Sequence, residues 1–501
     1  MLRKIRITLA AVMFMGLTLL FVDFTGTMRH LVGWMPRIQL LEAVLALNVA
    51  VIVALVAVTF IFGRIYCSVI CPLGVMQDVI AWFGKKKKKR RYTCSPEKKW
   101  LRYPVLAVFV AAMFLGVGTL VQLFAPYSAF GRIATNVMQP LWMGVNNLLA
   151  MLSEYFDDYT FWTADLWLRS WPSLIISVVT LAVVGVLAWR NGRTYCNTVC
   201  PVGTVLSLIS RYSVFKIRFD EEKCRNCSLC TKNCKASCID FKTHTVDASR
   251  CVTCGDCVEV CKFGALSYSV SKRGKPARIA EEPVKKQEVT SSDSSSRRNF
   301  LMATVALATT VMAQEKKKTD GGLAELTDKV APERVTPLTP PGSMSAANMA
   351  KRCTGCQLCV TECPNGVLRP QTDLLHLMQP VMSYERGYCR PECNRCSEVC
   401  PAGAIKPITP EVKASTQIGH AVWIKKNCLV VIDGIACGNC ARHCPVGAIE
   451  MMPLDENDDN SPFVPMVNET RCIGCGACEN LCPVRPFSAI YVEGHEVHKE
   501  I

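Results

Sequence analysis

Cysteine is the residue type in this chain whose number and spacing could do chemistry. The 501 residues include 30 cysteines, and 24 of these fall into six groups of four. Four groups have the pattern C-x2-C-x2-C-x3-C, the spacing of bacterial ferredoxins, and two have a longer first gap. Zinc sites instead use two cysteine pairs on either side of a longer loop, so the spacing predicts six 4Fe-4S clusters. The groups are Cys224, Cys227, Cys230 and Cys234; Cys251, Cys254, Cys257 and Cys261; Cys353, Cys356, Cys359 and Cys363; Cys389, Cys393, Cys396 and Cys400; Cys428, Cys437, Cys440 and Cys444; and Cys472, Cys475, Cys478 and Cys482.

Crossed ligation, in which the fourth cysteine of a group binds the neighbouring cluster, assigns the ligands within each pair of groups. In the first pair, Cys261 joins the first three cysteines of group 224–234, and Cys234 joins those of group 251–261. Cys238 lies four residues beyond Cys234 and is an alternative crossing ligand. Among the later groups we pair the first with the second and the third with the fourth. Pairing of outer group with outer group stays open.

Two further segments carry paired cysteines and repeat each other, GRIYCSVICPLGVMQDVI at 63–80 and GRTYCNTVCPVGTVLSLIS at 192–210. The thiols of each pair are four residues apart and share one face if the segment is helical. A buried free cysteine often serves only as a small apolar residue, but here the Gly-Arg-x-Tyr frame and the proline recur with the thiols. We therefore expect a redox, metal-binding or quinone-adjacent role for them. The four thiols are Cys67, Cys71, Cys196 and Cys200, whereas the isolated Cys94 is expected to be incidental.

Four apolar runs of the sequence lie near these repeated motifs and are expected to hold them at a membrane. Each run is long enough, or nearly so, to cross a bilayer, although the shortest could also be a core helix. We predict a membrane module over 1–213 with four spans in two related helix pairs, each ending in a Cys-x3-Cys-Pro motif. A two-cluster domain follows at 214–270. The runs are 5–24, 38–62, 104–124 and 173–189.

The formal net charge of +16 does not indicate a nucleic-acid partner, because membrane topology accounts for the largest basic block. The largest basic block, at 85–91, lies between the second and third apolar runs, and the positive-inside rule places that loop in the cytoplasm. If the chain crosses the membrane four times within residues 1–293, its N-terminus and its two-cluster domain also lie in the cytoplasm. The expected location is therefore the inner (cytoplasmic) membrane, which the chain crosses several times.

The segment SSSRRNFLMATVALATTVMAQ at 294–314 has the layout of a twin-arginine export signal, although it lies far from the N-terminus. Polar linkers are predicted on either side, at 271–299 and 314–350. As a signal, 294–313 would export the chain behind it, 314–501, which contains the four-cluster domain at 351–501. It would either remain as a fifth span or be cleaved. The alternative is that all the clusters stay in the cytoplasm.

Other cofactors have no matching motif. His30 is the only histidine before His244, so two histidines cannot ligate a haem among the apolar runs, and there is no CxxCH motif for an attached haem. No GxGxxG or P-loop motif is present. No haem, flavin or nucleotide site is therefore evident, and the chain is expected to carry electrons through iron–sulfur clusters.

Residues 1–270 resemble the NapH family, the membrane ferredoxin-type subunits associated with periplasmic nitrate reductase, in their apolar runs, Cys-x3-Cys-Pro motifs and two-cluster domain. The nitrous-oxide-reductase regulator NosR and the cytochrome-oxidase assembly factor CcoG share this layout. Residues 294–501 resemble the NapG and MauM type of exported ferredoxin, through GYCRPECNRC, IGHAVWIKKNCL and the groups that end in Cys-Pro. The expected fold is a membrane α-helical module joined to α+β, bacterial-ferredoxin-like dicluster domains.

The resemblance implies that quinol is oxidised at the membrane and that electrons pass to a periplasmic reductase, such as nitrate reductase, or to a small cytochrome. The chain would then be a quinol dehydrogenase component of anaerobic respiration. The alternative is an assembly or metal-handling factor whose Cys-x3-Cys-Pro motifs bind or reduce copper for a respiratory oxidase or reductase. In either case the sequence shows no cofactor that bridges the membrane between the cytoplasmic and the exported clusters.

Overall fold

A computed structural model describes residues 2–88, 92–270, 327–455, 457 and 461–501. The chain divides into two compact units, of which the first comprises 1–142, 169–271 and 328–501. The described residues of the second are 143–168 and 327. All 30 cysteines lie in the first unit. The predicted signal at 294–313 lies outside the described residues.

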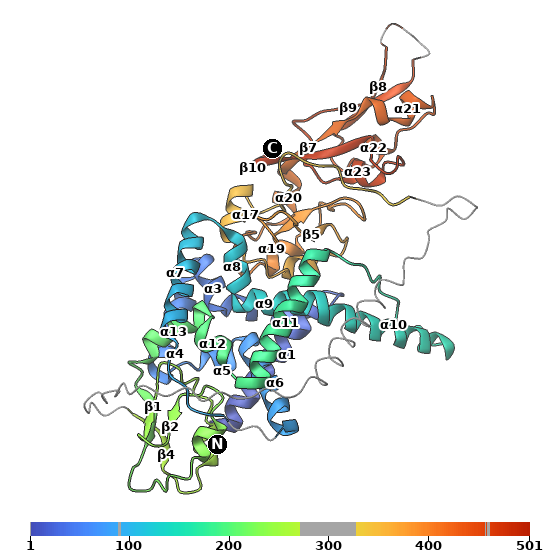
Figure 1. Ribbon diagram of the computed structural model, residues 1–501. Coiled ribbons are helices and arrows are strands. Elements are labelled where there is room, and N and C mark those ends of the chain that lie inside the picture. Colours follow the sequence, from blue (N-terminus) through green and yellow to red (C-terminus); the bar gives the residue numbers. More distant parts are fainter. Residues whose placement is uncertain (1, 89–91, 271–326, 456, 458–460) are drawn as a thin grey trace, which may run out of the picture. The chain divides into compact units, whose positions relative to one another are not determined.

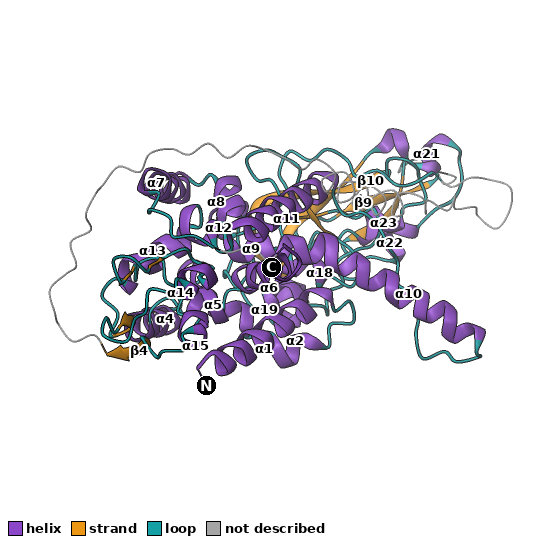
Figure 2. Ribbon diagram, turned by 60° about the horizontal axis from the view of Figure 1, so that its bottom comes forward, coloured by secondary structure: helices purple, strands orange, loops and turns teal. Residues whose placement is uncertain are grey.

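Helices make up the N-terminal part of the chain, and short strands and loops make up the cysteine-rich parts (Figures 1 and 2). The helices are α1 (Leu2–Val22), α2 (Met28–Val32), η1 (Met35–Ile38), α3 (Leu40–Leu45), α4 (Val49–Phe62), α5 (Tyr66–Val69), α6 (Pro72–Lys88), α7 (Lys99–Leu115), α8 (Gly118–Phe124), α9 (Pro126–Ile133), η2 (Ala134–Met138), α10 (Gln139–Tyr155), α11 (Trp171–Asn191), α12 (Thr194–Thr198) and α13 (Pro201–Ser210).

Among the described residues, two helices, α1 and α11, are long and apolar enough to cross a membrane. They correspond to the first and last predicted runs. The run 38–62 is not one helix, because Leu47 adopts a left-handed backbone (φ 57°) between α3 and α4. Asn48 then caps α4 by accepting a hydrogen bond from the Val51 N–H (3.3 Å). The resulting α4 has only 14 residues.

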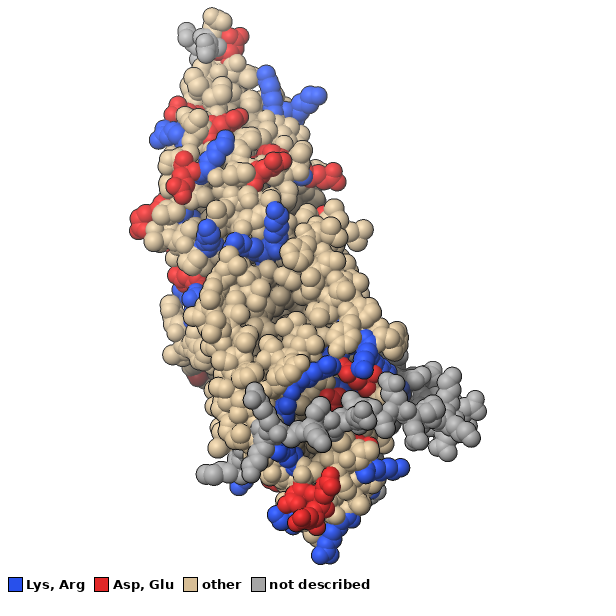
Figure 3. All heavy atoms as spheres, turned by 90° about the vertical axis from the view of Figure 1, so that its left-hand side faces the viewer, with Lys and Arg blue, Asp and Glu red and all other residues tan. Residues whose placement is uncertain are grey.

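The run 104–124 is also interrupted. Gly116 ends α7 in a left-handed conformation (φ 75°), and α8 begins two residues later. Four continuous spans are therefore not confirmed. Apolar side chains are nevertheless exposed along α4 and α7, including Val53, Phe60 and Phe114. The middle of the face shown in Figure 3 carries few charged side chains, as expected of a surface that meets lipid.

A half-buried acidic residue on α6 joins several elements. The Asp78 carboxylate accepts hydrogen bonds from Arg193 Nε (2.7 Å) and Arg6 Nη1 (3.0 Å), and it lies 3.3 Å from Lys235 Nζ. Burial by itself would raise the pKa of Asp78, but these three cations lower it well below its ordinary range. Asp78 therefore links α1, the residue before α12 and the two-cluster domain.

Replacing Asp78 by asparagine is expected to lower the free energy of unfolding by about 3–5 kcal/mol, because three buried or half-buried cations would lose their shared carboxylate. The measurement is denaturant unfolding of the purified, cluster-loaded protein. Asp220→Asn is the matched control, because the ion pair between Asp220 and Lys223 lies at the surface and should contribute almost nothing. Equal unfolding midpoints for the two variants would contradict a joining role for Asp78.

The two-cluster domain is closed by an antiparallel pair of strands at its two ends. β1 pairs with β4 so that Phe219 lies opposite Leu266, and β2 and β3 form a short hairpin. The cysteine loops and the two short helices lie between these strands. The elements are β1 (Phe215–Phe219), α14 (Leu229–Asn233), β2 (Ile239–Asp240), β3 (Thr245–Val246), α15 (Asp256–Val260) and β4 (Leu266–Val270).

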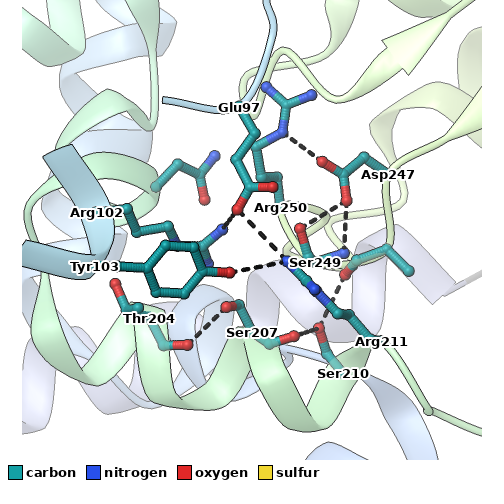
Figure 4. Close-up of polar contacts among 12 residues, drawn as sticks. Glu97, Arg102, Tyr103, Thr204, Ser207, Ser210, Arg211, Asp247, Ser249 and Arg250 are labelled. Carbon is teal, nitrogen blue, oxygen red and sulfur yellow. Dashed lines mark hydrogen bonds and ion pairs between the residues drawn. The ribbon is translucent and has the colours of Figure 1, made fainter. Parts of the chain in front are cut away.

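Polar contacts fix this domain to the helices that precede it (Figure 4). Glu97, just before α7, accepts a hydrogen bond from Arg102 (2.7 Å) and pairs with Arg211 at the end of α13 (3.6 Å). Ser210 Oγ, also on α13, donates to the carbonyl oxygen of Ala248 in the two-cluster domain (2.9 Å). The Glu97 contacts join parts of the helical module to each other. The contact of Ser210, together with the hydrogen bond from Arg250 to the Ser95 carbonyl oxygen (2.6 Å), holds the two-cluster domain against that module.

The four-cluster domain contains three separate strand pairs. β5 pairs with β6, β8 pairs with β9, and the C-terminal β10 pairs with β7. The elements are α17 (Ala346–Arg352), α18 (Leu358–Thr361), β5 (Leu368–Pro370), β6 (Pro380–Met382), α19 (Arg395–Val399), α20 (Pro410–Ser415), β7 (Thr416–Trp423), η3 (Lys425–Asn427), α21 (Leu429–Ile432), α22 (Asn439–Arg442), β8 (Ile449–Pro453), β9 (Phe463–Val467), α23 (Ala477–Leu481) and β10 (Ile490–Glu500).

The described part of the predicted linker 314–350 packs against this domain. Leu338 is fully buried in its core, and its carbonyl oxygen accepts a hydrogen bond from the Met382 N–H (2.9 Å). Arg334 donates two hydrogen bonds to the Glu479 carboxylate (2.6 and 2.8 Å). The expectation of a linker up to residue 350 was therefore wrong for 328–350, whose few apolar and charged side chains find partners far along the chain.

The two cluster-bearing domains contact opposite ends of helix α1. At its N-terminal end, Arg3 pairs with Asp256 of the two-cluster domain (2.9 Å). Just beyond its C-terminal end, the Thr25 carbonyl oxygen accepts a hydrogen bond from Arg395 of the four-cluster domain (3.4 Å). An α-helix of 21 residues is about 30 Å long, so the two domains contact opposite ends of a membrane-length helix.

Candidate iron–sulfur centres

In the first half of the four-cluster domain, the thiols form two sets whose members interact electrostatically. Each set takes three cysteines from one group and the fourth from the other, which is the arrangement that crossed ligation predicts. The sets bring neighbouring groups together rather than outer groups. One set is Cys353, Cys356, Cys359 and Cys400, and the other is Cys363, Cys389, Cys393 and Cys396.

The second half of the domain shows the same crossing. One small cavity is lined by Cys444 of the third group together with Cys472, Cys475 and Cys478 of the fourth. Across the pair, Cys440 interacts electrostatically with Cys437 and Cys482. The place of Cys428 in that last set stays a prediction.

The two halves meet through one cysteine from each. The Cys389 N–H donates a hydrogen bond to the Cys475 carbonyl oxygen (2.9 Å). Tyr384 is fully buried beside them, and its hydroxyl donates to the Gly474 carbonyl oxygen (2.6 Å). The set containing Cys389 is thus next to the set containing Cys475, which arranges the four sets in sequence.

In the two-cluster domain, Cys234 interacts with all three leading cysteines of the second group, 251–261. The Cys238 sulfur lies 3.6 Å from that of Cys234, and Cys238 also contacts Cys251. This geometry favours Cys234 as the crossing ligand, although both thiols are adjacent to the set. In the first group Cys227 and Cys230 interact, whereas the approach of Cys261 to them stays a prediction.

The donor chemistry of these sites is that of iron–sulfur ligands. Backbone N–H groups donate to several of the sulfurs, as thiolate ligands require; examples are Gly355 to Cys353 (3.4 Å) and Ala448 to Cys444 (3.2 Å). Among the described residues, no three His, Cys, Asp or Glu side chains are grouped closely enough to hold a metal ion. Cluster ligands are necessarily further apart, because each thiolate binds a different iron.

The four cysteines of the two repeated motifs are also brought together. Each is only 4% exposed, and all belong to one buried core. Burial raises the pKa of the Cys200 thiol well above its ordinary range, and the other three thiols raise it further. Cys94, in contrast, is exposed and apart from these thiols. The repeat therefore builds one shared site.

Glu42 is a buried carboxyl that the cysteine motifs did not reveal. It is 1% exposed, and among the described residues its Oε1 atom has no hydrogen-bond partner. It lies close to Tyr66, which precedes Cys67, and to Cys356 of the four-cluster domain. The available signal was that Glu42 is the single charged residue in an otherwise apolar run. A buried carboxyl with an oxygen that has no described partner requires a functional explanation.

Models of iron–sulfur domain families match three parts of the chain. A model described as "4Fe-4S binding domain" matches residues 44–91 and 170–220, which contain the two Cys-x3-Cys-Pro motifs. Two models described as "4Fe-4S dicluster domain" match 247–367 and 435–485. Iron–sulfur domains thus match both the helical module and the cysteine-rich domains.

Curated relatives of the chain are named as ferredoxin-type or putative electron transport proteins. The chain is 31% identical to the methylamine utilization ferredoxin-type protein MauM of Methylobacillus flagellatus, over 32% of this chain and 70% of that protein. It is 30% identical to the ferredoxin-type protein NapG of Escherichia coli, over 33% and 77% respectively. It is 25% identical to the putative electron transport protein YccM of Escherichia coli, over 44% and 58%. No solved structure matches the chain.

These relatives and the crossed cysteine sets agree on the same chemistry. The match covers most of MauM and NapG but about a third of this chain, and no relative of the NapH type is among those compared above. The chain therefore belongs to the family of ferredoxin-type iron–sulfur electron-transfer proteins that includes MauM and NapG.

Proposed function

We propose that this protein is a membrane-bound quinol dehydrogenase component that relays electrons through 4Fe-4S clusters to a redox partner across the membrane. The observation that carries the proposal is the placement of the cysteine sets along the first unit. One pair of sets contacts the N-terminal end of α1, and the chain of four sets begins at its C-terminal end. Such an arrangement conducts electrons from one end of a membrane-length helix toward the other.

The helical module contacts the first set of the four-cluster domain closely. A Cβ at Gly131 on α9 would collide with the Cys356 carbonyl oxygen, so this approach requires glycine. Gln357, the next residue, donates a hydrogen bond to Ser173 of α11 (2.6 Å) and accepts one from Asn136 (2.8 Å). The cluster held by the Cys356 set is therefore the entry point to the four-cluster domain.

Quinol oxidation supplies the electrons in this proposal. Oxidising one quinol to quinone releases two electrons and two protons, so the one-electron clusters need an adjacent proton acceptor. Glu42 is a buried carboxyl that interacts electrostatically with Tyr66 and with Cys356, and Tyr66 itself donates a hydrogen bond to Gln39 (2.9 Å). We assign Glu42 as the group that accepts the two quinol protons one after the other and passes each to water, while the two electrons enter the clusters one at a time.

The orientation follows from charge and export. Residues 1–293 would have their non-membrane parts on the cytoplasmic side, because the basic block 85–91 remains there. The twin-arginine segment would carry 314–501 to the periplasmic side. The partner there is a terminal reductase such as nitrate reductase, or a small cytochrome. A reporter fused behind Ile501, which is exposed, should therefore be active on the periplasmic side.

The test is anaerobic reduction of the purified, cluster-loaded chain in liposomes by a menaquinol analogue. The visible cluster absorption should bleach, and the electron paramagnetic resonance signals of reduced clusters should appear. Dithionite provides the reference for full reduction. Clusters that dithionite reduces but the quinol leaves oxidised would contradict quinol oxidation, while leaving the electron-transfer family intact.

A further inference from the structure

The two Cys-x3-Cys-Pro motifs interlock through exchanged arginines. Arg64, which begins the first motif, donates a hydrogen bond to the carbonyl oxygen of Cys196 in the second (3.1 Å). Arg193, which begins the second motif, donates to the carbonyl oxygen of Cys67 in the first. Each arginine is completely buried. The repeat therefore pairs as two related halves: Cys67 and Cys196 lie on the short helices α5 and α12, and Cys71 and Cys200 directly precede α6 and α13.

Polar groups also reach the sulfurs themselves. Gln77 Nε2 lies 3.3 Å from the Cys196 sulfur, and Arg64 Nη2 lies 3.8 Å from that of Cys67. The Gly203 N–H points at the Cys200 sulfur (3.3 Å). Burial of these thiols opposes their ionisation, and donors to the sulfurs offset part of that cost by favouring the thiolate. Gln77 contacts the Cys196 sulfur with both ends of its amide, since its Oε1 atom lies 3.6 Å away. Cysteines that served only as small apolar residues would not need these donors.

Arg64 brings a buried positive charge into this site. Its hydrogen bonds go to Asn197 Oδ1 (2.8 Å), to the Ser249 carbonyl oxygen (3.0 Å) and to Cys196. No ion pair of Arg64 with a carboxylate exists among the described residues, whereas Arg193 is paired with Asp78. A buried guanidinium is costly unless negative charge lies beside it. Arg64 interacts with Cys251 of the two-cluster domain and also with Cys67 and Cys196 of the repeated motifs, so it favours thiolates in both places.

We propose that Cys67, Cys71, Cys196 and Cys200 together ligate a further iron–sulfur cluster, with two thiolates from each repeat. Each of the matched segments, 44–91 and 170–220, contains only two cysteines, so one segment alone cannot supply the four ligands that such a cluster takes. The burial and the exchanged arginines show how the two segments combine. This cluster is additional to the six of the proposed function and does not depend on quinol.

A cluster fits the site better than a single ion does. Four thiolates around one tetrahedral metal lie within about 4 Å of one another, given metal–sulfur bonds of about 2.3 Å. The described residues contain no group of three such ligands close enough for one ion. The ferredoxin-type sets share that property, since their ligands surround several irons. Copper or zinc held by these four thiols is therefore disfavoured.

The site lies between the two-cluster domain and the contact with Cys356, so a cluster there would pass electrons from one to the other. On one side, Arg64 interacts with Cys251, and Asn197 Nδ2 donates to the Ala236 carbonyl oxygen (3.2 Å), both in the two-cluster domain. On the other side, the Tyr195 hydroxyl donates to the Phe124 carbonyl oxygen (3.1 Å), near the contact with Cys356. The cluster receives one electron from one neighbour as it passes one to the other, and no bond is made or broken.

The decisive experiment compares iron and acid-labile sulfide in three anaerobically purified full-length proteins: wild type, the double variant Cys67→Ser/Cys196→Ser, and the matched control Cys94→Ser. The double variant should lose about two or four irons with equal sulfide, according to cluster type, while the control loses none. Dithionite titration should show one fewer reducible centre. Unchanged iron, or copper bound in place of iron, would overturn the proposal.

A second variant keeps the test independent of folding. Gln77→Leu preserves side-chain volume and all cysteines but removes the donor to Cys196. The reduction potential of one centre should become more negative, and the iron content and all other centres should remain unchanged. If no potential moves, Gln77 contacts no cluster and the site is empty. Neither measurement uses quinol, so the quinol proposal can fail separately.

Discussion

Glu42→Gln is expected to slow quinol-driven reduction of the clusters by about 100-fold or more, within the roughly 10²- to 10⁴-fold contribution of a positioned general base. Glutamine keeps the size and polarity of the side chain but cannot accept the quinol proton. Because Glu42 is buried and its Oε1 atom has no partner among the described residues, the variant breaks no described hydrogen bond of that atom. The measurement is stopped-flow bleaching after mixing with a menaquinol analogue.

Two controls separate proton transfer from damage to the protein. Dithionite reduction of Glu42→Gln should match wild type, since it bypasses quinol. Glu362→Gln makes the same change at another buried glutamate, within the four-cluster domain, and should leave the quinol-driven rate unchanged. A wild-type quinol rate in Glu42→Gln would remove Glu42 from the mechanism and leave the relay itself intact.

Serine in place of the crossing cysteine Cys363 is expected to abolish the cluster of the Cys389 set and to interrupt the relay in its middle. Quinol should then reduce the clusters beyond the missing one more slowly, by on the order of 100-fold. Loss of a residue that only orients a metal ligand costs about 10- to 100-fold in affinity or activity, and loss of a ligand itself should cost at least as much. The reason is position, because this set lies between the entry set of Cys356 and the set of Cys475.

Pairs of substitutions test the ligand sets themselves. Cys363→Ser and Cys396→Ser should remove the same cluster, so the double variant should lose about four irons, as each single variant does. Cys363→Ser with Cys478→Ser should remove two clusters, and about eight irons. Additive iron loss from the first pair would refute crossed ligation between neighbouring groups. Pairing of outer groups predicts the opposite pattern for the two double variants.

The local spacing of the cysteines was sufficient to predict iron–sulfur chemistry. Three ligands of a ferredoxin-type set lie within a few residues of one another, so the sequence itself places them on one loop. Continuity of helices was harder to predict. Hydropathy is averaged over a window, and it does not register the left-handed turn at Leu47 or the helix end at Gly116. The sequence therefore located the apolar runs but not their interruptions.

The packing of 328–350 was missed for a related reason. Its composition is polar, and its few anchors, such as Leu338 and Arg334, find partners more than forty residues away. A composition-based argument has no access to such distances. Glu42 was visible as a lone charge in an apolar run, but its closeness to Tyr66 and Cys356 joins residues from separate elements.

By itself, the sequence determined that this is an iron–sulfur electron carrier, because thiolate number and spacing specify cluster chemistry locally. The tertiary structure alone decided which thiols meet. Arg64 and Cys196 are 132 residues apart in the chain, and yet they share one buried site with the other repeated cysteines. Contacts over such separations arise from the packing of whole helices, whose free energy is distributed over many side chains and is not encoded in any single motif.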